Sequence, residues 1–507
     1  MGSVSINSAT STAVPYRGLI TLSIMLATIM QVLDTTIANV ALPHMQGSLS
    51  ATQDQITWIL TSYIVASAIM TLPTGWMAGR FGRKNVFLVS TAGFTLTSVM
   101  CGMAGSIEAM VLFRVLQGCF GAALVPLAQA TLLDINPREK HGSAMAMWGV
   151  GVMIGPILGP TLGGYLTEFY NWRWVFLINL PLGVITFVGL WLFMPDSERS
   201  ERPFDKFGFF TLTLVIGCVQ LTLDRGEHVG WLEAREILLY CAVGCSALWM
   251  YAVHTRQTAH PFLSPAMFRD RNLVASLFFI FFVGIILLAT MALLPPYMQN
   301  LMGYPVLDVG TLMAPRGMGT MVAMMIVGKL THRIDPRILI LSGLALTAMS
   351  LFQMSLFTTY VPPFMLIWTG AMQGFGLGFI FVPLSTVAYA TLAPQYRAEA
   401  ASVFSLTRNM GSSIGISMVM AVLGRNMQIN HAYLSEYITP FSAGMSINQL
   451  PSSLASQAGA ALALMDAEVS RQAATIAYLN DFRLMMWIVI AAAPLVLLLR
   501  RPAPVVA

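Results

Sequence analysis

Asp34 is the first side chain whose type and position suggest chemistry. It lies in the stretch "MQVLDTTIANVALP" (Met30–Pro43), within an apolar run that begins near Gly18, and no opposite charge is near it in sequence. A lone charge is unfavourable in lipid, so Asp34 should face water or the interior of a helix bundle. Burial disfavours an ionised carboxylate and a nearby cation favours it, so a site that alternates between these conditions can bind and release a proton.

Arg114 is the cation expected at the same depth. Asp34 lies about eight residues before the outer end of its predicted helix, and Arg114 lies about six residues after the outer start of another. At about 1.5 Å per residue these offsets give depths of roughly 12 and 9 Å. We therefore predict that Asp34 carries a proton and that Arg114 tunes it, with a permanent structural ion pair as the alternative.

Two further arginines, Arg316 and Arg408, lie about ten and eight residues inside predicted helices. Such placements are unfavourable in lipid, so each should hold an anionic group or bond backbone carbonyls, one of which Pro315 frees beside Arg316. Packing and functional roles are both open for this pair. Asp134, by contrast, is expected as a surface or helix-end residue.

The stretch "GPILGPTLGG" (Gly155–Gly164) has small residues at intervals of four, which give a helix a flat face for close packing. Its prolines remove backbone hydrogen bonds and permit a bend. It therefore predicts a tight, kinked seam that seals a path between helices, with generic packing as the alternative. The seam residues are Gly155, Pro156, Gly159, Pro160, Gly163 and Gly164.

A short basic loop, "GWMAGRFGRK" (Gly75–Lys84), is predicted to gate one face. Its cations can meet helix C-termini and carboxylates and so hold one conformation, although part of the charge sets topology. The residues of this gating loop are Gly75, Gly79, Arg80, Gly82, Arg83 and Lys84. The chain also has 35 Met residues, which suit a pocket for varied apolar ligands. Polar and aromatic candidates for that pocket are Asn39, Gln117, Trp148 and Gln373.

The elements that position these residues are predicted to be membrane-spanning helices. The 507 residues are 56% hydrophobic and only 10% charged, far from the ~25% charged residues of soluble chains. A helix needs about 20 apolar residues to cross a bilayer, and these runs lack strand alternation. Fourteen spans are predicted, at 18–42, 55–78, 85–105, 108–133, 142–167, 172–194, 207–223, 235–254, 273–299, 306–328, 337–357, 363–392, 400–424 and 481–500.

The distribution of basic residues predicts the topology. With the N-terminus inside, eighteen of the 27 Lys and Arg residues fall in inner segments and six in outer segments. This asymmetry places both termini in the cytoplasm and explains the net charge of +5 without nucleic acid. One outer segment, 425–480, is predicted as a long loop in which a helix can form near 456–478, either a flexible insertion or a docking surface for a partner.

An internal repeat divides the chain. "GWMAGRFGRK" is echoed by "GKLTHRIDPR" (Gly328–Arg337), and "QGCFGAALVP" (Gln117–Pro126) by "QGFGLGFIFVP" (Gln373–Pro383). Parallel six-helix repeats are typical of transporters, with the substrate between the halves. The predicted units are a tail at 1–17, six-helix halves at 18–194 and 273–500, two extra central helices with linkers at 195–272, and a tail at 501–507.

These motifs together resemble the major facilitator superfamily, and within it the fourteen-span drug:proton antiporters of the EmrB type. "LDTTIANVALP", the gating loop, "RVLQGCFGAALVP", "GPILGPTLGG" and "NWRWVFLINLPLG" occur in the order of that family's motifs. The resemblance implies an all-α membrane protein with the major facilitator fold. One departure is Gly79, where the loop motif usually has an acid, so the loop's charge relay lacks one member.

The resemblance implies a proton-coupled antiporter that exports hydrophobic or amphipathic drugs across the bacterial inner membrane, with a periplasmic adaptor and an outer-membrane channel as partners. Its energy source is the proton gradient, and no cofactor or metal is expected. A dedicated metabolite or lipid exporter is the first alternative, and a membrane scaffold or sensor that transports nothing is the second. An enzyme is not expected, because the sequence lacks P-loop, dinucleotide and zinc-spacing motifs.

Overall fold

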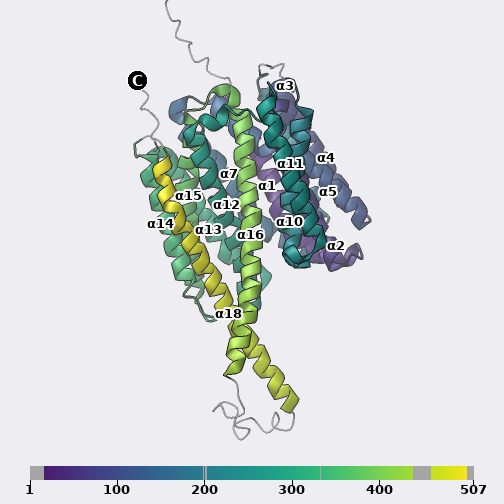
Figure 1. Ribbon diagram of the computed structural model, residues 1–507, viewed down its shortest axis with the longest axis vertical. Helices are drawn as coiled ribbons and strands as arrows, with labels where there is room; N and C mark the ends of the chain where they lie inside the picture. Colours follow the sequence, from purple (N-terminus) through teal and green to yellow (C-terminus); the bar gives the residue numbers. More distant parts are fainter. Residues whose placement is uncertain (1–15, 198, 200–202, 332, 438–457, 500–507) are drawn as a thin grey trace, which may run out of the picture.

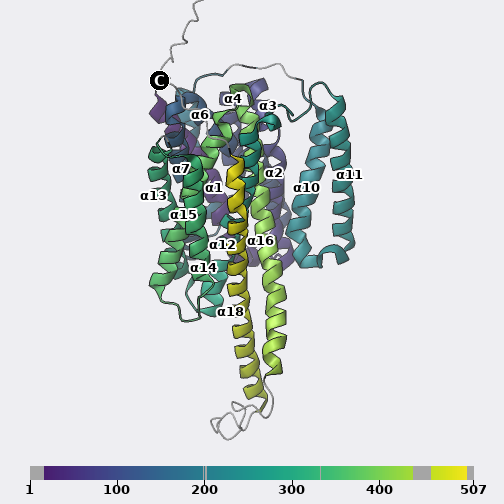
Figure 2. The same ribbon diagram turned by 60° about the vertical axis from the view of Figure 1, so that its left-hand side comes forward.

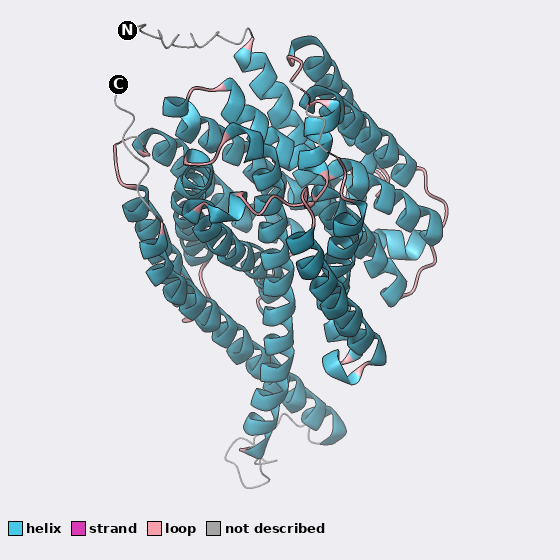
Figure 3. Ribbon diagram, turned by 45° about the horizontal axis from the view of Figure 1, so that its top comes forward, coloured by secondary structure: helices cyan, strands magenta, loops and turns pink. Residues whose placement is uncertain are grey.

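The computed structural model describes all residues except 1–15, 198, 200–202, 332, 438–457 and 500–507, and its described part contains helices and loops but no strand (Figures 1 and 3). This confirms the all-α membrane class. Lipid cannot satisfy open backbone groups, so a chain this apolar closes its hydrogen bonds within helices.

The first half is built from nine helical pieces, because several spans are broken. The bounds are α1 (Arg17–Ser48), α2 (Gln53–Thr71), α3 (Thr74–Phe81), α4 (Arg83–Gly102), α5 (Ile107–Gly121), α6 (Leu124–Ile135), α7 (His141–Phe169), α8 (Trp174–Leu177) and α9 (Asn179–Phe193). Two helices follow, α10 (Lys206–Val229) and α11 (Arg235–Gln257). The second predicted span is bent, since α2 and α3 meet at 53°.

The second half begins at α12 (Arg271–Pro296), which a π-helical turn extends to Leu301. Its other helices are α13 (Val306–Leu330), α14 (Pro336–Met354), α15 (Pro363–Ala390), α16 (Arg397–Glu436) and α18 (Ala458–Ala492). Within the described residues, eleven helices are long and apolar enough to cross a membrane, or twelve with the bent pair. The long helices α13 and α16 pack among them but are not among the eleven, so the count of fourteen stays a prediction.

The two extra helices form a hairpin at the edge of the bundle (Figure 2). In the apolar 18-residue stretch of each helix, only 22% of the residues of α10 and 17% of those of α11 are buried, against 61% for α15. They therefore lie on the outside of the bundle, where α10 packs against both α2 of the first half and α16 of the second, away from the contact of α7 with α13.

The segment 425–480, expected as a long loop, is helical on both sides of residues 438–457. The helices α16 and α18 run side by side and extend beyond the bundle at the end opposite α3 (Figures 1 and 2). The 40 residues of α16 span about 60 Å, roughly twice a hydrocarbon core. His431 Nε2 lies 3.1 Å from Asp466 Oδ1 across this projecting pair. The helix expected near 456–478 is present as the first part of α18. The continuation of α16 to Glu436 was not predicted, because that segment is rich in polar residues, and it is stabilised by packing against α18.

Candidate functional site

Asp34 is fully buried on α1 and is surrounded by hydrogen-bond donors. Arg114 Nη1 lies 2.7 Å from Asp34 Oδ2. Gln117 Nε2 and Asn179 Nδ2 each donate to Asp34 Oδ1 at 2.9 Å. These three donors give the arrangement that an ionised carboxylate requires away from water. The ion pair predicted from equal depth is therefore present.

Arg114 is held by more than the carboxylate. Its Nε donates to Ile59 O at 3.1 Å, and Nη1 also donates to Gln117 Oε1 at 2.7 Å. The guanidinium carbon lies 4.1 Å from the centre of the Tyr63 ring, close enough for a cation–π interaction. Because each contact has a direction, the side chain is fixed in position even when its charge partner changes.

Asn179 and Ser98 belong to this site, and the sequence-based prediction missed both. Asn179 Nδ2 donates to Ser98 Oγ at 3.0 Å as well as to Asp34, and Ser98 Oγ donates to Phe176 O at 2.9 Å. The signal was a single amide in the apolar stretch "VFLINLPLG". Depth alone did not reveal that α9 turns this amide toward α1.

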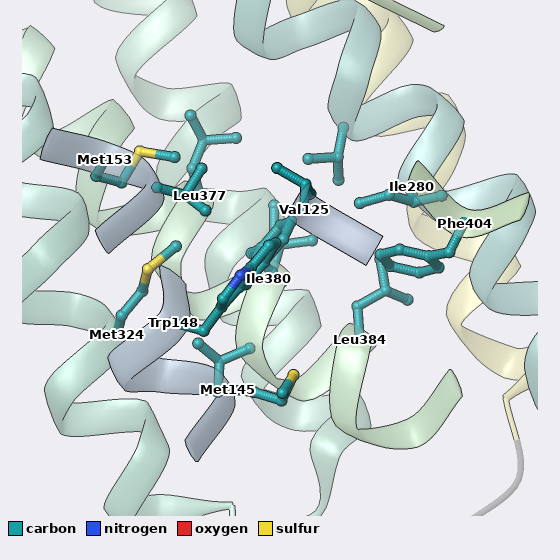
Figure 4. Close-up of a cluster of buried hydrophobic side chains, with 14 of the residues drawn as sticks. Val125, Met145, Trp148, Met153, Ile280, Met324, Leu377, Ile380, Leu384 and Phe404 are labelled. Atoms are coloured by element: carbon teal, nitrogen blue, oxygen red, sulfur yellow. The ribbon is translucent and has the colours of Figure 1, made fainter. Parts of the chain in front are cut away.

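The four candidate pocket residues do not meet in one place. Gln117 belongs to the Asp34 site, Asn39 is exposed, and Gln373 donates to Thr290 Oγ1 at 3.2 Å within the second half. Trp148 on α7 stacks on Phe381 of α15, with ring centres 5.7 Å apart. Figure 4 shows Trp148 among methionine and aliphatic side chains from both halves, so apolar packing fills the interface at this level.

The two intramembrane arginines differ in their surroundings. Arg316 is buried, and its Nη2 donates to Leu287 O at 3.0 Å, so the bonded carbonyl is on α12 and not in its own "APRG" segment. Arg316 Nη1 has no hydrogen-bond partner among the described residues. Arg408 is only half-buried on α16. Of these two arginines, Arg316 is thus the one with a buried donor, Nη1, that lacks an acceptor.

The seam residues pack directly on α1. A methyl group at Gly155 would lie 2.7 Å from Val32 Cγ1, and one at Gly163 would lie 2.9 Å from Ile37 Cγ1. Thr36 Oγ1 donates to Gly155 O at 3.0 Å. The helix α7 continues for 29 residues through both prolines of the motif. These glycines therefore permit the close approach of α7 to α1 that the small-residue spacing predicted.

Gly159→Leu is expected to destabilise the protein by about 1–3 kcal/mol, since a side chain there would collide with Thr36. The measurement is the apparent melting temperature of the purified protein. Gly424→Leu is the matched control, because a side chain at Gly424 enters open space. Equal melting temperatures for the two variants would contradict the seam.

The gating loop joins the two halves at its end of the bundle. A methyl group at Gly75 would lie 2.7 Å from Glu399 Cα on α16, and Gly82 has φ +86° at the junction of α3 and α4. Arg83 forms an ion pair with Asp134, and Asp134 Oδ1 also lies 2.8 Å from Arg397 Nη1. Asp134 is exposed in the last turn of α6, the surface or helix-end position expected, and it also links α4 and α6 to α16.

Asp134→Ala is expected to open this end of the bundle more often, because both arginines lose their partner. A partly exposed pair is worth about 1 kcal/mol, which corresponds to about a fivefold change in population. In a background with the native cysteines replaced by serine, maleimide labelling of Ser402→Cys, at a buried position of α16, should accelerate accordingly. Asp196→Ala removes an exposed carboxylate near the same loop and should leave the labelling rate unchanged.

Asp481 is a second fully buried carboxylate, on α18. Neither oxygen has a hydrogen-bond partner within the described residues. The sequence-based prediction missed it because the last span was expected to begin at this residue, where a carboxylate would meet water. The structure continues α18 well past it toward the projecting end, so the same residue lies inside the bundle.

Comparisons with known proteins agree with this architecture. Residues 24–416 match the sequence model of the Major Facilitator Superfamily. The multidrug export protein EmrB of Escherichia coli strain K12 is 34% identical over 429 residues, covering 84% of this chain and 83% of that protein. The fatty acid resistance protein FarB of Neisseria gonorrhoeae is 33% identical over 431 residues, covering 84% of each. The human organic anion transporter MFSD10 shares the fold, with a TM-score of 0.59 at 14% identity, covering 94% of this chain and 100% of that one.

Proposed function

Because the chain belongs to the Major Facilitator Superfamily, we propose that it is a proton-coupled antiporter that exports amphipathic and hydrophobic drugs. The observation that carries the proposal is the buried Asp34–Arg114 pair with its amide donors. A titratable group that the bundle shields from solvent is what proton coupling requires. The names of the relatives, multidrug export protein and fatty acid resistance protein, support export of apolar compounds.

In the proposed cycle, Asp34 is ionised and bound to Arg114 in one state and protonated in the other. Protonation removes the charge that Arg114, Gln117 and Asn179 stabilise, so it weakens the contacts that join α1 to α5 and α9. Cargo binding favours release of the proton, and the two halves rock between inward and outward access. The Asp134 bridge closes one end during part of this cycle.

We place the protein in the bacterial inner membrane with both termini in the cytoplasm. The charge asymmetry of the loops supports this orientation. It puts the projecting α16–α18 pair in the periplasm, where we propose that it contacts an adaptor leading to an outer-membrane channel. Exposed apolar side chains near its tip, including Tyr433, Tyr437 and Leu464, support a docking role.

Two other functions are candidates. The likeness to a fatty acid resistance protein favours a dedicated lipid or metabolite exporter as the second. A scaffold or sensor that transports nothing is the third, and the buried charges argue against it, since they are unfavourable unless they serve a cycle.

The test uses the purified chain in lipid vesicles with an acidic lumen that contains the pH dye pyranine. Adding N-phenyl-1-naphthylamine, a neutral apolar dye, or ethidium should make the lumen lose protons faster than in protein-free vesicles. Nigericin, which collapses the pH gradient, should abolish ethidium accumulation. Accumulation that persists without a gradient would contradict proton coupling, and the absence of both proton release and accumulation would favour the scaffold.

A further inference from the structure

Arg316 carries a buried positive charge that the protein only partly compensates. The residue is 6% exposed, and one hydrogen bond, from Nη2 to Leu287 O, is present while Nη1 has no partner among the described residues. No described carboxylate forms an ion pair with it. A buried cation in this situation is strongly unfavourable, so the site is incomplete without an anion.

Arg316 borders a cavity between the two halves. The cavity has about 470 Å³ of empty space, part of it open to the surroundings, and α7 of the first half and α12 and α13 of the second line it. Its other walls are mostly apolar and flexible, with Met153, Ile157, Leu287, Met291 and Met313 among them. A second hollow of about 270 Å³ lies at the same arginine, between α12, α13 and α15.

The internal repeat explains why the protein supplies no carboxylate here. The offset of 253 residues between Gly75 and Gly328 places Arg316 opposite Tyr63 and Leu287 opposite Asp34. In the first half a cation stacks on Tyr63 and pairs with Asp34. In the second half the cation stands at the tyrosine's position, and the acid's position is a leucine that offers only its carbonyl.

We propose that the cavity beside Arg316 binds the acid group of an amphipathic carboxylate cargo. Nη1 donates to the carboxylate, and a planar guanidinium matches the two oxygens of that group better than any other side chain does. The methionines and aliphatic side chains take the apolar body, to which flexible thioethers adapt. The inference rests on the proposed export function and adds a substrate class to it.

The site's location couples binding to access. Pro156 and Ile157 on α7 line the cavity together with Gly317 on α13, and a methyl group at Gly317 would collide with Ile157. A cargo that bridges these helices therefore contacts both halves where they approach closely.

The test measures equilibrium binding of two fluorescent probes that share one apolar body, the carboxylate 1-pyrenebutyrate and the neutral alcohol 1-pyrenebutanol, to the full chain in lipid nanodiscs. The wild-type protein should bind the carboxylate at least about tenfold more tightly than the alcohol. Arg316→Gln should bind both equally, and Arg316→Lys should keep part of the preference. Arg408→Gln is the matched control, since Arg408 borders neither hollow, and its preference should equal that of the wild type.

A wild-type protein without preference for the carboxylate, or an Arg316→Gln variant that retains it, would overturn the proposal. If Arg316→Gln fails to fold, the proposal is tested by the carboxylate preference of Arg316→Lys and by the thermal shift of the wild type. Pyrenebutyrate should raise the melting temperature of the wild type more than pyrenebutanol does, and an equal shift from both probes would refute the site.

The binding test and the test of the export function can fail independently of each other. Proton release on addition of N-phenyl-1-naphthylamine should persist in Arg316→Gln, because a neutral dye does not need the guanidinium. If the wild type releases no protons with any compound, the export function fails, and the binding comparison still decides whether Arg316 recognises a carboxylate.

Discussion

Asp34→Asn is expected to reduce substrate-driven proton release to the level of protein-free vesicles. The amide keeps the shape of the side chain and still accepts from Gln117 and Asn179, but it cannot exchange a proton. Because the amide leaves Arg114 buried without its counter-charge, the purified variant should melt at a lower temperature than the wild type, and proton release is compared below that temperature. The measurement is pyranine fluorescence on addition of N-phenyl-1-naphthylamine, with ethidium accumulation as a second readout.

Asp481→Asn is the matched control for this experiment, because it makes the same chemical change at another buried carboxylate. Asp481 has no cation or hydrogen-bond donor in the described structure to stabilise its ionised form, so it stays protonated throughout the cycle, and its replacement by an amide should leave coupling intact. If Asp481→Asn abolished proton release while Asp34→Asn did not, the carrier would be on α18 and the proposed cycle would be wrong.

Arg114→Leu is expected to destabilise the protein by about 3–5 kcal/mol, since it leaves a buried carboxylate without its counter-charge. It also removes the donor to Ile59 O and the contact with the Tyr63 ring. The variant should be recovered from membranes in low yield and should melt at a clearly lower temperature than the wild type. Arg114→Lys should be intermediate, because one ammonium cannot reach Asp34, Gln117 and Ile59 in the same geometry.

A double variant separates folding from function. Asp34→Asn combined with Arg114→Leu removes both charges, so its stability should recover most of what Arg114→Leu loses, while proton release stays absent. A double variant that is no more stable than Arg114→Leu would show that Arg114 acts mainly through packing and its backbone bond, and would argue against the ion pair as the main contact.

The sequence by itself determined the class of the protein and the depth of its charged groups. Apolar runs of about 20 residues specify helices in lipid, because no other single-chain element closes its backbone hydrogen bonds there. The constant rise of a helix then converts position in sequence into depth, so the shared layer of Asp34 and Arg114 follows from their residue numbers and helix ends. The spacing of Gly155, Gly159 and Gly163 likewise specified a packing face, although not its partner.

Only the tertiary structure decided what lies around each residue at a given depth. Rotation about a helix axis and the order of helices around the bundle depend on side-chain packing across the whole fold, which a single segment does not encode. For that reason the sequence did not predict Asn179 and Ser98 as members of the site. Gln117, predicted to line a pocket, binds Asp34 instead, and Asp134 links the two halves. Packing also places Arg316 beside a cavity, with no described carboxylate next to it. Depth in the membrane alone could not distinguish this arginine from Arg114, which is paired.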